Sequence, residues 1–146
     1  MEITPSHRKG ISVALTSLDE MLCVVEGWAK GREAHGVLYR ERNALSLRRR
    51  EQLLTEVTRI RLLLKPLLDI LGLEGRAESA ADDIWGMCAA LRAHLMELES
   101  GPLRRYGPVS SQLGTLMDSY LPRLLEGVDR ISRLVSQERG NPPARR

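Results

Sequence analysis

The sequence predicts an all-α protein, an antiparallel up-down four-helix bundle with a leucine-rich core. Apolar residues recur with the 3.6-residue helical period in four long segments, and no segment shows the alternation of a strand. Aromatic residues make up 3% of the 146 residues and Phe is absent, so Leu, Ala, Val and Met must fill the core. Such a core suits helix packing better than a sheet, which favours β-branched and aromatic residues. Short connections between the four segments favour antiparallel neighbours.

The first helix is expected from about Pro5 to Glu33. Thr4 is a suitable N-cap, and Pro5 occupies the first helical position, where its missing N–H is tolerated. The predicted apolar stripe consists of Ile11, Leu15, Leu18, Leu22, Val25 and Ala29.

The second helix is expected to begin near Leu38 or Asn43 and to run to Leu71, where Gly72 ends it. The predicted stripe consists of Leu53, Val57, Ile60, Leu64, Leu67 or Leu68, and Leu71. Pro66 lies opposite this stripe and is expected to kink the helix or to split it, so residues 38–72 form either one helix or two.

The third helix is expected from about Ala77 to Ser100, with Gly101 after its end. Asp82 and Asp83 fall in its early turns, where the helix dipole favours acidic side chains. The predicted stripe consists of Ile84, Cys88, Leu91, Leu95 and Leu98.

The fourth helix is expected from about Pro108 to Gln137, again with a kink at an outward proline, Pro122. The predicted stripe consists of Leu113, Met117, Tyr120, Leu124, Val128, Ile131 and Val135. We therefore expect a single helical-bundle domain over residues 1–138. Residues 139–146 form a short basic tail that we expect to be disordered.

The sequence lacks the motifs of the common catalytic and metal sites. His7, His35 and His94 do not have metal-ligand spacing, and no C-x-x-C, H-E-x-x-H or glycine-rich phosphate loop occurs. We expect neither a cofactor nor a metal, and we expect that the protein is not an enzyme.

A cytoplasmic location is expected from the cysteines and the N-terminus. Cys23 and Cys88 sit in apolar helical patterns and are expected to be buried free thiols in a reducing compartment. The N-terminal residues MEITPSHRKGISVAL contain no apolar core of a signal peptide. No unbroken apolar run, Leu62 to Leu64 included, is long enough to span a bilayer, so no membrane association is expected.

A basic segment suggests one kind of partner. Residues 39–65 contain eight Arg or Lys and three Glu, a net charge of +5. A polyanion such as nucleic acid binds where cations cluster, and the candidates are Arg48, Arg50, Arg61 and Lys65. The alternative is a solvated helix face, because Glu51 lies three residues from Arg48 and Glu56 three from Arg59.

An apolar surface suggests a protein partner instead. Trp85, Arg92 and Met96 share one side of their helix, beside its core stripe. Leu116 and Leu125, with Leu121 and Leu134, widen the apolar face of the last helix beyond a narrow stripe. Surplus apolar surface indicates self-association or a partner, whereas the alternative is a broad core face. The predicted partner-binding residues are Trp85, Arg92, Met96, Leu116 and Leu125.

The segment RREQLLTEVTRIRLLLKPLLDILGLEG, residues 49–75, is followed by a short linker and a last amphipathic helix. This layout resembles the flagellar and related export chaperones, which are small, cytoplasmic, Leu-rich helical proteins that cradle a helix of their partner. The function expected from the residues is a helical protein–protein interaction module, or a subunit of a larger assembly, that binds a partner helix or itself through an apolar groove. A nucleic-acid-associated helical subunit is the alternative, and an export-chaperone-like binder is a second alternative.

Overall fold

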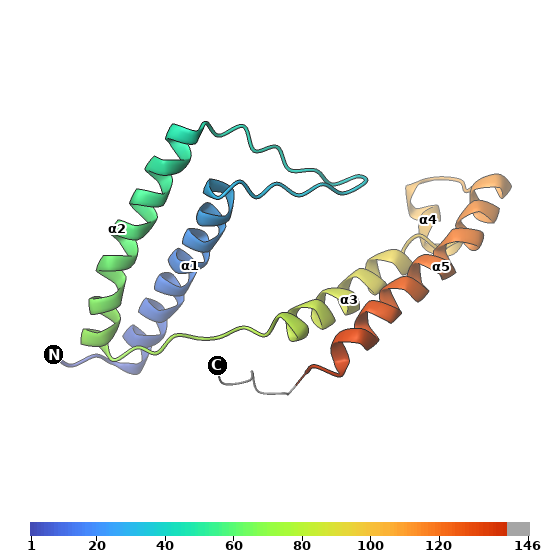
Figure 1. Ribbon diagram of the computed structural model, residues 1–146. Helices are drawn as coiled ribbons and strands as arrows, with labels where there is room; N and C mark the ends of the chain where they lie inside the picture. Colours follow the sequence, from blue (N-terminus) through green and yellow to red (C-terminus); the bar gives the residue numbers. More distant parts are fainter. Residues whose placement is uncertain (140–146) are drawn as a thin grey trace. The chain divides into compact units, whose positions relative to one another are not determined.

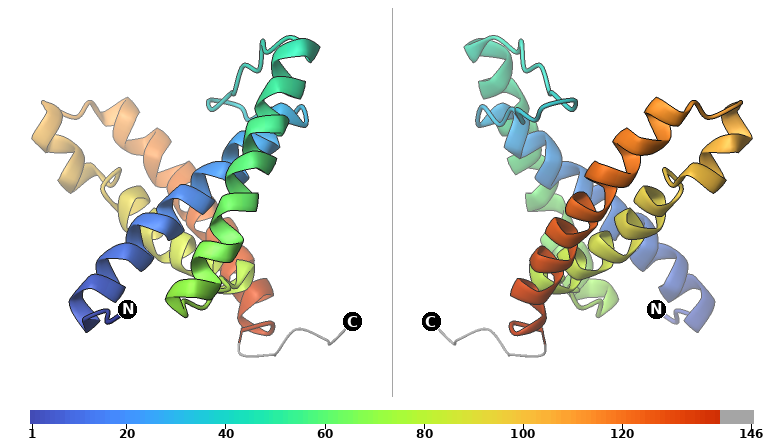
Figure 2. Two further views of the ribbon diagram at one scale, coloured as in Figure 1. Left: turned by 90° about the vertical axis from the view of Figure 1, so that its left-hand side faces the viewer. Right: turned by 90° about the vertical axis from the view of Figure 1, so that its right-hand side faces the viewer.

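The structure is a computed structural model that describes residues 1–139 of the 146. The described part is all-α and contains no strand, which confirms the predicted fold class. The chain divides into two compact units, Met1–Arg76 and Ala77–Arg146. Of the predicted tail, all but Arg139 lies outside the described residues. The closed four-helix bundle stays a prediction, because each unit by itself is one helical hairpin (Figures 1 and 2).

The first hairpin consists of α1 (Pro5–Ala29) and α2 (Leu47–Leu71). The predicted start of α1 is confirmed: the side chain of Thr4 accepts a hydrogen bond from the backbone N–H of His7 at 3.2 Å, and Pro5 is the first helical residue. The helix ends at Ala29, four residues earlier than expected from the sequence. Gly31, with φ of 93°, follows the end of the helix in a left-handed conformation that glycine adopts without strain.

Asn43 fixes the end of α1 and the connection that follows. Its side-chain amide donates to the carbonyl oxygens of Trp28 at 2.7 Å and Arg32 at 3.0 Å, and its backbone N–H donates to Glu33 at 2.8 Å. These contacts hold residues 30–46 outside any helix. The expected start of the second helix near Leu38 or Asn43 is therefore wrong, and α2 begins at Leu47.

The caps of α2 are local in sequence. Ser46 accepts a hydrogen bond from the N–H of Arg49 at its start, and Gly72 ends the helix in the left-handed conformation, as predicted, with φ of 62°. Arg8 donates to the carbonyl oxygens of Leu71 and Gly72 at 3.0 and 2.9 Å, which ties the end of α2 to the start of α1. A single helix passes through Pro66, so the segment forms one helix and not two.

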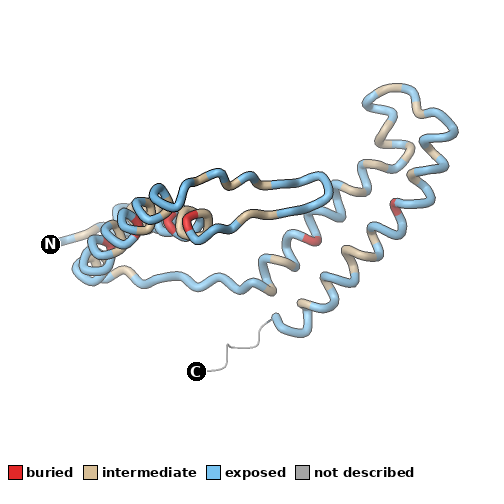
Figure 3. The backbone as a smooth tube through the Cα atoms, turned by 45° about the horizontal axis from the view of Figure 1, so that its top comes forward, coloured by how far each residue is buried: buried red, intermediate tan, exposed pale blue. Residues whose placement is uncertain are grey.

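The core of the first hairpin is formed by the two predicted stripes. Leu22, Val57 and Leu64 are buried, and Leu15, Leu18, Val25 and Ile60 pack against them. Figure 3 shows buried segments of α1 and α2 in red. Cys23 was expected to be buried, but it is exposed, because it lies one residue beyond Leu22 and so about 100° around the helix from it.

The second hairpin consists of α3 (Ala80–Met96) and α5 (Ser111–Ser136), joined by a turn that contains α4 (Ser100–Leu103) and the 3₁₀ helix η1 (Arg104–Tyr106). Ser79 and Ser110 cap α3 and α5 with their side chains, and Asp82 and Asp83 lie in the first turn of α3 as predicted. The helix expected to reach Ser100 ends at Met96, and the sequence analysis missed α4 and η1.

The core of the second hairpin is small. Cys88 on α3 and Leu121 on α5 are its buried residues. Cys88 is buried as predicted, whereas Leu121 lies outside the predicted stripe of the last helix. Four of that stripe's residues are instead exposed: Leu113, Tyr120, Leu124 and Ile131. The buried side of α5 is therefore rotated from the predicted one, and part of its apolar face is bare. Within residues 1–139, no helix is both long enough and apolar enough to cross a membrane.

Candidate protein-interaction surface

A line of large apolar side chains on α5 is not covered within the described part of the second hairpin. These residues are between 40% and 73% exposed, and they are Leu113, Leu116, Tyr120, Leu124, Ile131 and Leu134. They follow one another at intervals of three, four or seven residues, which places them on one side of the helix. We call this set the α5 seam. A contiguous exposed apolar surface of this kind is typical of a binding interface.

The α5 seam is bare because α3 packs against another side of α5. Arg92 of α3 donates to both carboxylate oxygens of Asp129 of α5, at 2.6 and 2.7 Å. Asp129 follows Tyr120 by nine residues, which is about 180° around the helix at about 100° per residue. The ion pair therefore lies across α5 from the seam.

A second contact closes the same hairpin near the start of α3. Arg139 donates to Asp82 at 2.7 Å, and its guanidinium group lies over the ring of Trp85 at 4.0 Å from the ring centre. Near the start of α3, Asp82 pairs with Arg139, which follows the end of α5. Later in α3, Arg92 pairs with Asp129, which lies earlier in α5. The two contacts show that α3 and α5 run antiparallel.

The bare surface continues from α5 onto α3. Met87 and Leu91 are more than half exposed. Met87 precedes Arg92 by five residues, so it lies about 140° around α3 from the ion pair. In an antiparallel hairpin, the sides of both helices that face away from the ion pair form one common surface. Met87 and Leu91 therefore extend the surface that carries the α5 seam.

The structure does not gather the five predicted partner-binding residues at one place. Trp85 packs under Arg139 and Arg92 is paired with Asp129, so both lie on the ion-pair side of the hairpin. Met96 is exposed at the end of α3. Leu116 belongs to the α5 seam, whereas Leu125 is half-buried.

The sequence analysis missed the seam as a site because it assigned most of its residues to the core. The signal was nevertheless present, since the predicted stripe and the widening residues Leu116 and Leu134 together form an apolar face too broad for one neighbouring helix. One helix packed against another covers only part of such a face.

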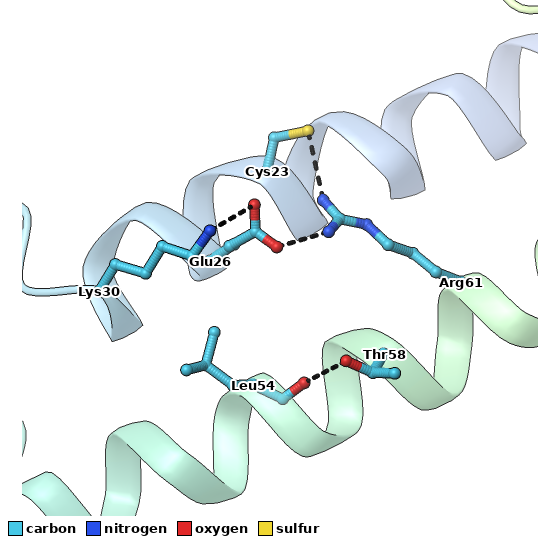
Figure 4. A network of polar contacts seen from close by, with 6 residues as sticks. All are labelled: Cys23, Glu26, Lys30, Leu54, Thr58 and Arg61. Carbon is cyan, nitrogen blue, oxygen red and sulfur yellow. Dashed lines mark hydrogen bonds and ion pairs between the residues drawn. The ribbon is translucent and has the colours of Figure 1, made fainter.

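The four candidate polyanion-binding residues do not form a free cationic cluster. Arg61 donates to Glu26 at 2.5 Å, and its other terminal nitrogen lies 3.7 Å from the sulfur of Cys23 (Figure 4). The hydrogen bond from Arg61 lowers the pKa of the Glu26 carboxyl, and the same bond raises the pKa of Arg61. The pair is therefore charged at neutral pH, and Arg61 is neutralised by its partner.

The remaining candidates on α2 lie far apart. Arg50 donates through Nε to the carbonyl oxygen of Leu45 at 3.0 Å and so supports the helix start. Arg48 and Lys65 make no ion pair within the described chain, but they are 17 positions apart, which corresponds to roughly 25 Å along the helix. Arg50 and Arg61 thus make contacts within the first hairpin.

A groove of about 510 Å³ runs along the first hairpin. Its apolar lining includes Leu15, Leu64 and Leu68, and both acidic and basic side chains edge it, among them Asp19 and Lys65. Such a volume accommodates a small ligand. The mixed charges do not select an anion or a cation, and no cluster of three or more potential metal ligands occurs among the described residues.

No family model matches the chain, and neither a curated protein nor a solved structure is found to be similar to it.

Proposed function

We propose that the protein is a helical protein–protein interaction module, or a subunit of a larger assembly, that binds a helix through the apolar side of its second hairpin. The observation that carries this proposal is the α5 seam. Six large apolar side chains lie on one side of a 26-residue helix, while the ion pair of Arg92 with Asp129 holds α3 elsewhere. A helix that lays its apolar face into such a surface is a common mode of protein recognition.

The second hairpin by itself lacks a large apolar core. Helices in proteins are stabilised mostly by packing of their apolar face, and this hairpin buries only Cys88 and Leu121 among its described residues. Covering a half-exposed Leu or Ile side chain contributes roughly 1 kcal/mol. The stabilisation from six such residues on each side of a contact is of the same order as the free-energy cost of association, which is about 4–15 kcal/mol.

In this proposal, the four-helix bundle expected from the sequence forms when the protein assembles. A helical hairpin becomes an antiparallel four-helix bundle when two more helices cover its bare side. In that state we expect α2 and α5 to bend at Pro66 and Pro122. We place the assembly in the cytoplasm, because free thiols such as Cys23 and Cys88 are typical of a reducing compartment.

The test compares hydrophobic-probe fluorescence and light scattering after size exclusion for the natural chain and for a Leu116→Gln/Leu134→Gln variant. We expect the natural chain to bind the probe or to self-associate, and the variant to lose most of that signal. The matched control is Leu62→Gln, which changes an exposed leucine of α2 outside the seam. A natural chain that is strictly monomeric and binds no probe contradicts the proposal.

A nucleic-acid-associated role remains the alternative, supported by the net charge of +5 over residues 39–65. To distinguish the two roles, the light-scattering experiment on the purified protein is repeated after nuclease treatment and over a range of salt concentrations. Co-eluting nucleic acid that disappears with nuclease or salt would favour the basic segment, because phosphate contacts weaken steeply with salt. A salt-insensitive assembly favours the α5 seam. Export-chaperone-like binding belongs to the same class as the main proposal.

A further inference from the structure

We propose that the α5 seam is covered by the α5 seam of a second copy of the chain, packed antiparallel around a twofold axis close to Leu124. This inference rests on the proposed function and names the partner. It follows from three features of α5: the order of large and small residues along the seam, the open space at Gly127, and the charges beside the seam.

The spacing of the seam is nearly the same when α5 is read from either end. From the N-terminal end it steps by three and then four residues, through Leu113, Leu116 and Tyr120. From the C-terminal end it steps by three, from Leu134 to Ile131, and four residues further on the same side lies Gly127, which is not itself a seam residue. An antiparallel second copy therefore places Leu113 opposite Leu134, Leu116 opposite Ile131 and Tyr120 opposite Gly127. A surface that matches itself in this way is what a twofold interface requires.

The seam also keeps its direction along the helix. Leu113, Leu116 and Tyr120 recur eleven residues later as Leu124, Gly127 and Ile131. An eleven-residue repeat corresponds to about 3.67 residues per turn, close to the α-helix itself. The apolar line therefore stays almost parallel to the helix axis, so two copies of α5 can contact along it.

Gly127 supplies the space that the opposite tyrosine needs. A Cβ atom at Gly127 would meet no other atom within 4 Å, so no neighbour in its own hairpin requires a glycine there. Glycine in a helix interior lowers helix stability. Tyr120, with about half of its surface exposed, is the large residue that an antiparallel copy brings to this position. Its ring fills the gap left by the missing side chain.

The charges beside the seam fit the same arrangement. Arg123 lies over the Tyr120 ring at 5.7 Å from the ring centre and makes no ion pair within the described part of the chain. Glu126 pairs with Arg130 one turn further along, at 2.6 Å. Around a twofold axis near Leu124, each Arg123 comes within about one turn of Glu126 of the other copy. Arg123 and Glu126 of the two copies then lie in one central group, in which each Glu126 is also paired with Arg130 of its own chain.

The first test separates helix stability from association. Gly127→Leu adds a good helix former in open space, so the hairpin itself is not destabilised, but the new side chain occupies the place of the opposite Tyr120. We expect the dimer dissociation constant, measured by sedimentation over a concentration series, to rise at least about tenfold because the contact is overpacked. Gly86→Leu is the matched control: Gly86 is an exposed α3 glycine with equally open space, and it lies away from the seam. We expect its dissociation constant to change by less than about threefold.

The second test reads the register by disulfide formation in a Cys23→Ser background. We expect Leu113→Cys combined with Leu134→Cys to give a covalent dimer on mild oxidation, and Leu113→Cys alone to give none. Cysteines bridge only when their Cα atoms lie within about 7 Å, whereas positions 113 and 134 of one helix are roughly 30 Å apart. A dimer formed by Leu113→Cys alone indicates parallel helices and overturns the proposal.

The outcomes distinguish this inference from the function on which it rests. A natural chain that is monomeric at all concentrations but binds the hydrophobic probe overturns the twofold dimer and leaves the interaction module, with a different partner or the chain's own helices over the seam. A monomer that binds no probe overturns both. A dimer that Gly127→Leu and Gly86→Leu weaken equally, or not at all, uses another surface and also overturns the inference.

Discussion

Arg92 of α3 and Asp129 of α5 are joined by two hydrogen bonds, of 2.6 and 2.7 Å, across the middle of the second hairpin. Both side chains remain half exposed, so their attraction is screened by water, and such pairs contribute about 0–1 kcal/mol. The importance of the pair is geometric. It marks the side of α5 that faces α3, and in this orientation Leu121 is buried and Tyr120 is bare.

The first prediction concerns this ion pair. Arg92→Gln and Asp129→Asn should each lower the free energy of unfolding by no more than about 1 kcal/mol, with a coupling energy of the same size. Chemical denaturation of the single and double variants measures both quantities. A coupling well above this range would show that the pair is buried in an assembly, since desolvated pairs are worth more when one partner is removed.

How far the sequence predicted the fold depends on whether a contact is local. The sequence predicted the N-cap at Thr4, the helix end at Gly72 and the two stripes of the first hairpin. A cap or a helix period involves residues only a few positions apart. The end of α1 was not predicted, because it depends on Asn43, which contacts Trp28 from 15 residues away.

The same distinction explains the candidate site. The apolar width of α5 could be read from the sequence, but the side that α3 covers is set by contacts between residues far apart in the chain, such as Arg92 with Asp129, 37 residues away. The predicted bundle assumed that every apolar stripe is covered. A hairpin covers one side of each helix and leaves the other bare, and this is the physical reason that Leu113, Tyr120 and Leu124 were assigned to the core.

The second prediction concerns the core of the first hairpin. Leu22 is 1% exposed and lies at the centre of its cluster, so Leu22→Ala should lower the free energy of unfolding by about 2–5 kcal/mol through lost burial and a cavity. Leu62→Ala, at a position 69% exposed, should change it by less than about 0.5 kcal/mol. Denaturant titration followed by circular dichroism compares them. Equal effects would mean that Leu62 is covered in solution.

The third prediction uses the ion pair of Glu26 with Arg61. The hydrogen bond from Arg61 lowers the pKa of Glu26 in the folded chain below the value of 4.5 for a free glutamate. A lowered folded-state pKa gives stability that is present above the unfolded value and is lost as the pH falls through the folded value. The natural chain should therefore lose more stability between neutral pH and a pH well below 4.5 than Glu26→Gln does.

The measurement for Glu26 is urea denaturation at each pH, and Glu20→Gln is the control, because Glu20 is an exposed acid of α1 with no ion pair in the described structure. The control should keep the pH dependence of the natural chain. If Glu26→Gln kept it as well, the hydrogen bond between Glu26 and Arg61 would not persist in solution.

The fourth prediction distinguishes the two thiols. Cys23 is exposed and Cys88 is buried, so a thiol reagent should modify one cysteine per native chain rapidly and the second only on unfolding. Cys23→Ser should remove the rapid phase and leave the slow one. Two rapid phases in the natural chain would show that the second hairpin opens readily around Cys88.

The fifth prediction concerns Trp85, whose ring lies 4.0 Å below the guanidinium group of Arg139. Arg139→Gln removes this group and the ion pair with Asp82, so the ring becomes more solvated and the hairpin loses about 0.5–1 kcal/mol. Fluorescence in a Trp28→Phe background reports Trp85 alone, and its emission should shift to longer wavelength. Arg133→Gln changes an arginine within α5 rather than the one that stacks on Trp85, and it should leave the emission unchanged. If the emission of Arg139→Gln were also unchanged, the stacking of Arg139 on Trp85 would not hold in solution, and Trp85 would then be free to join a partner surface.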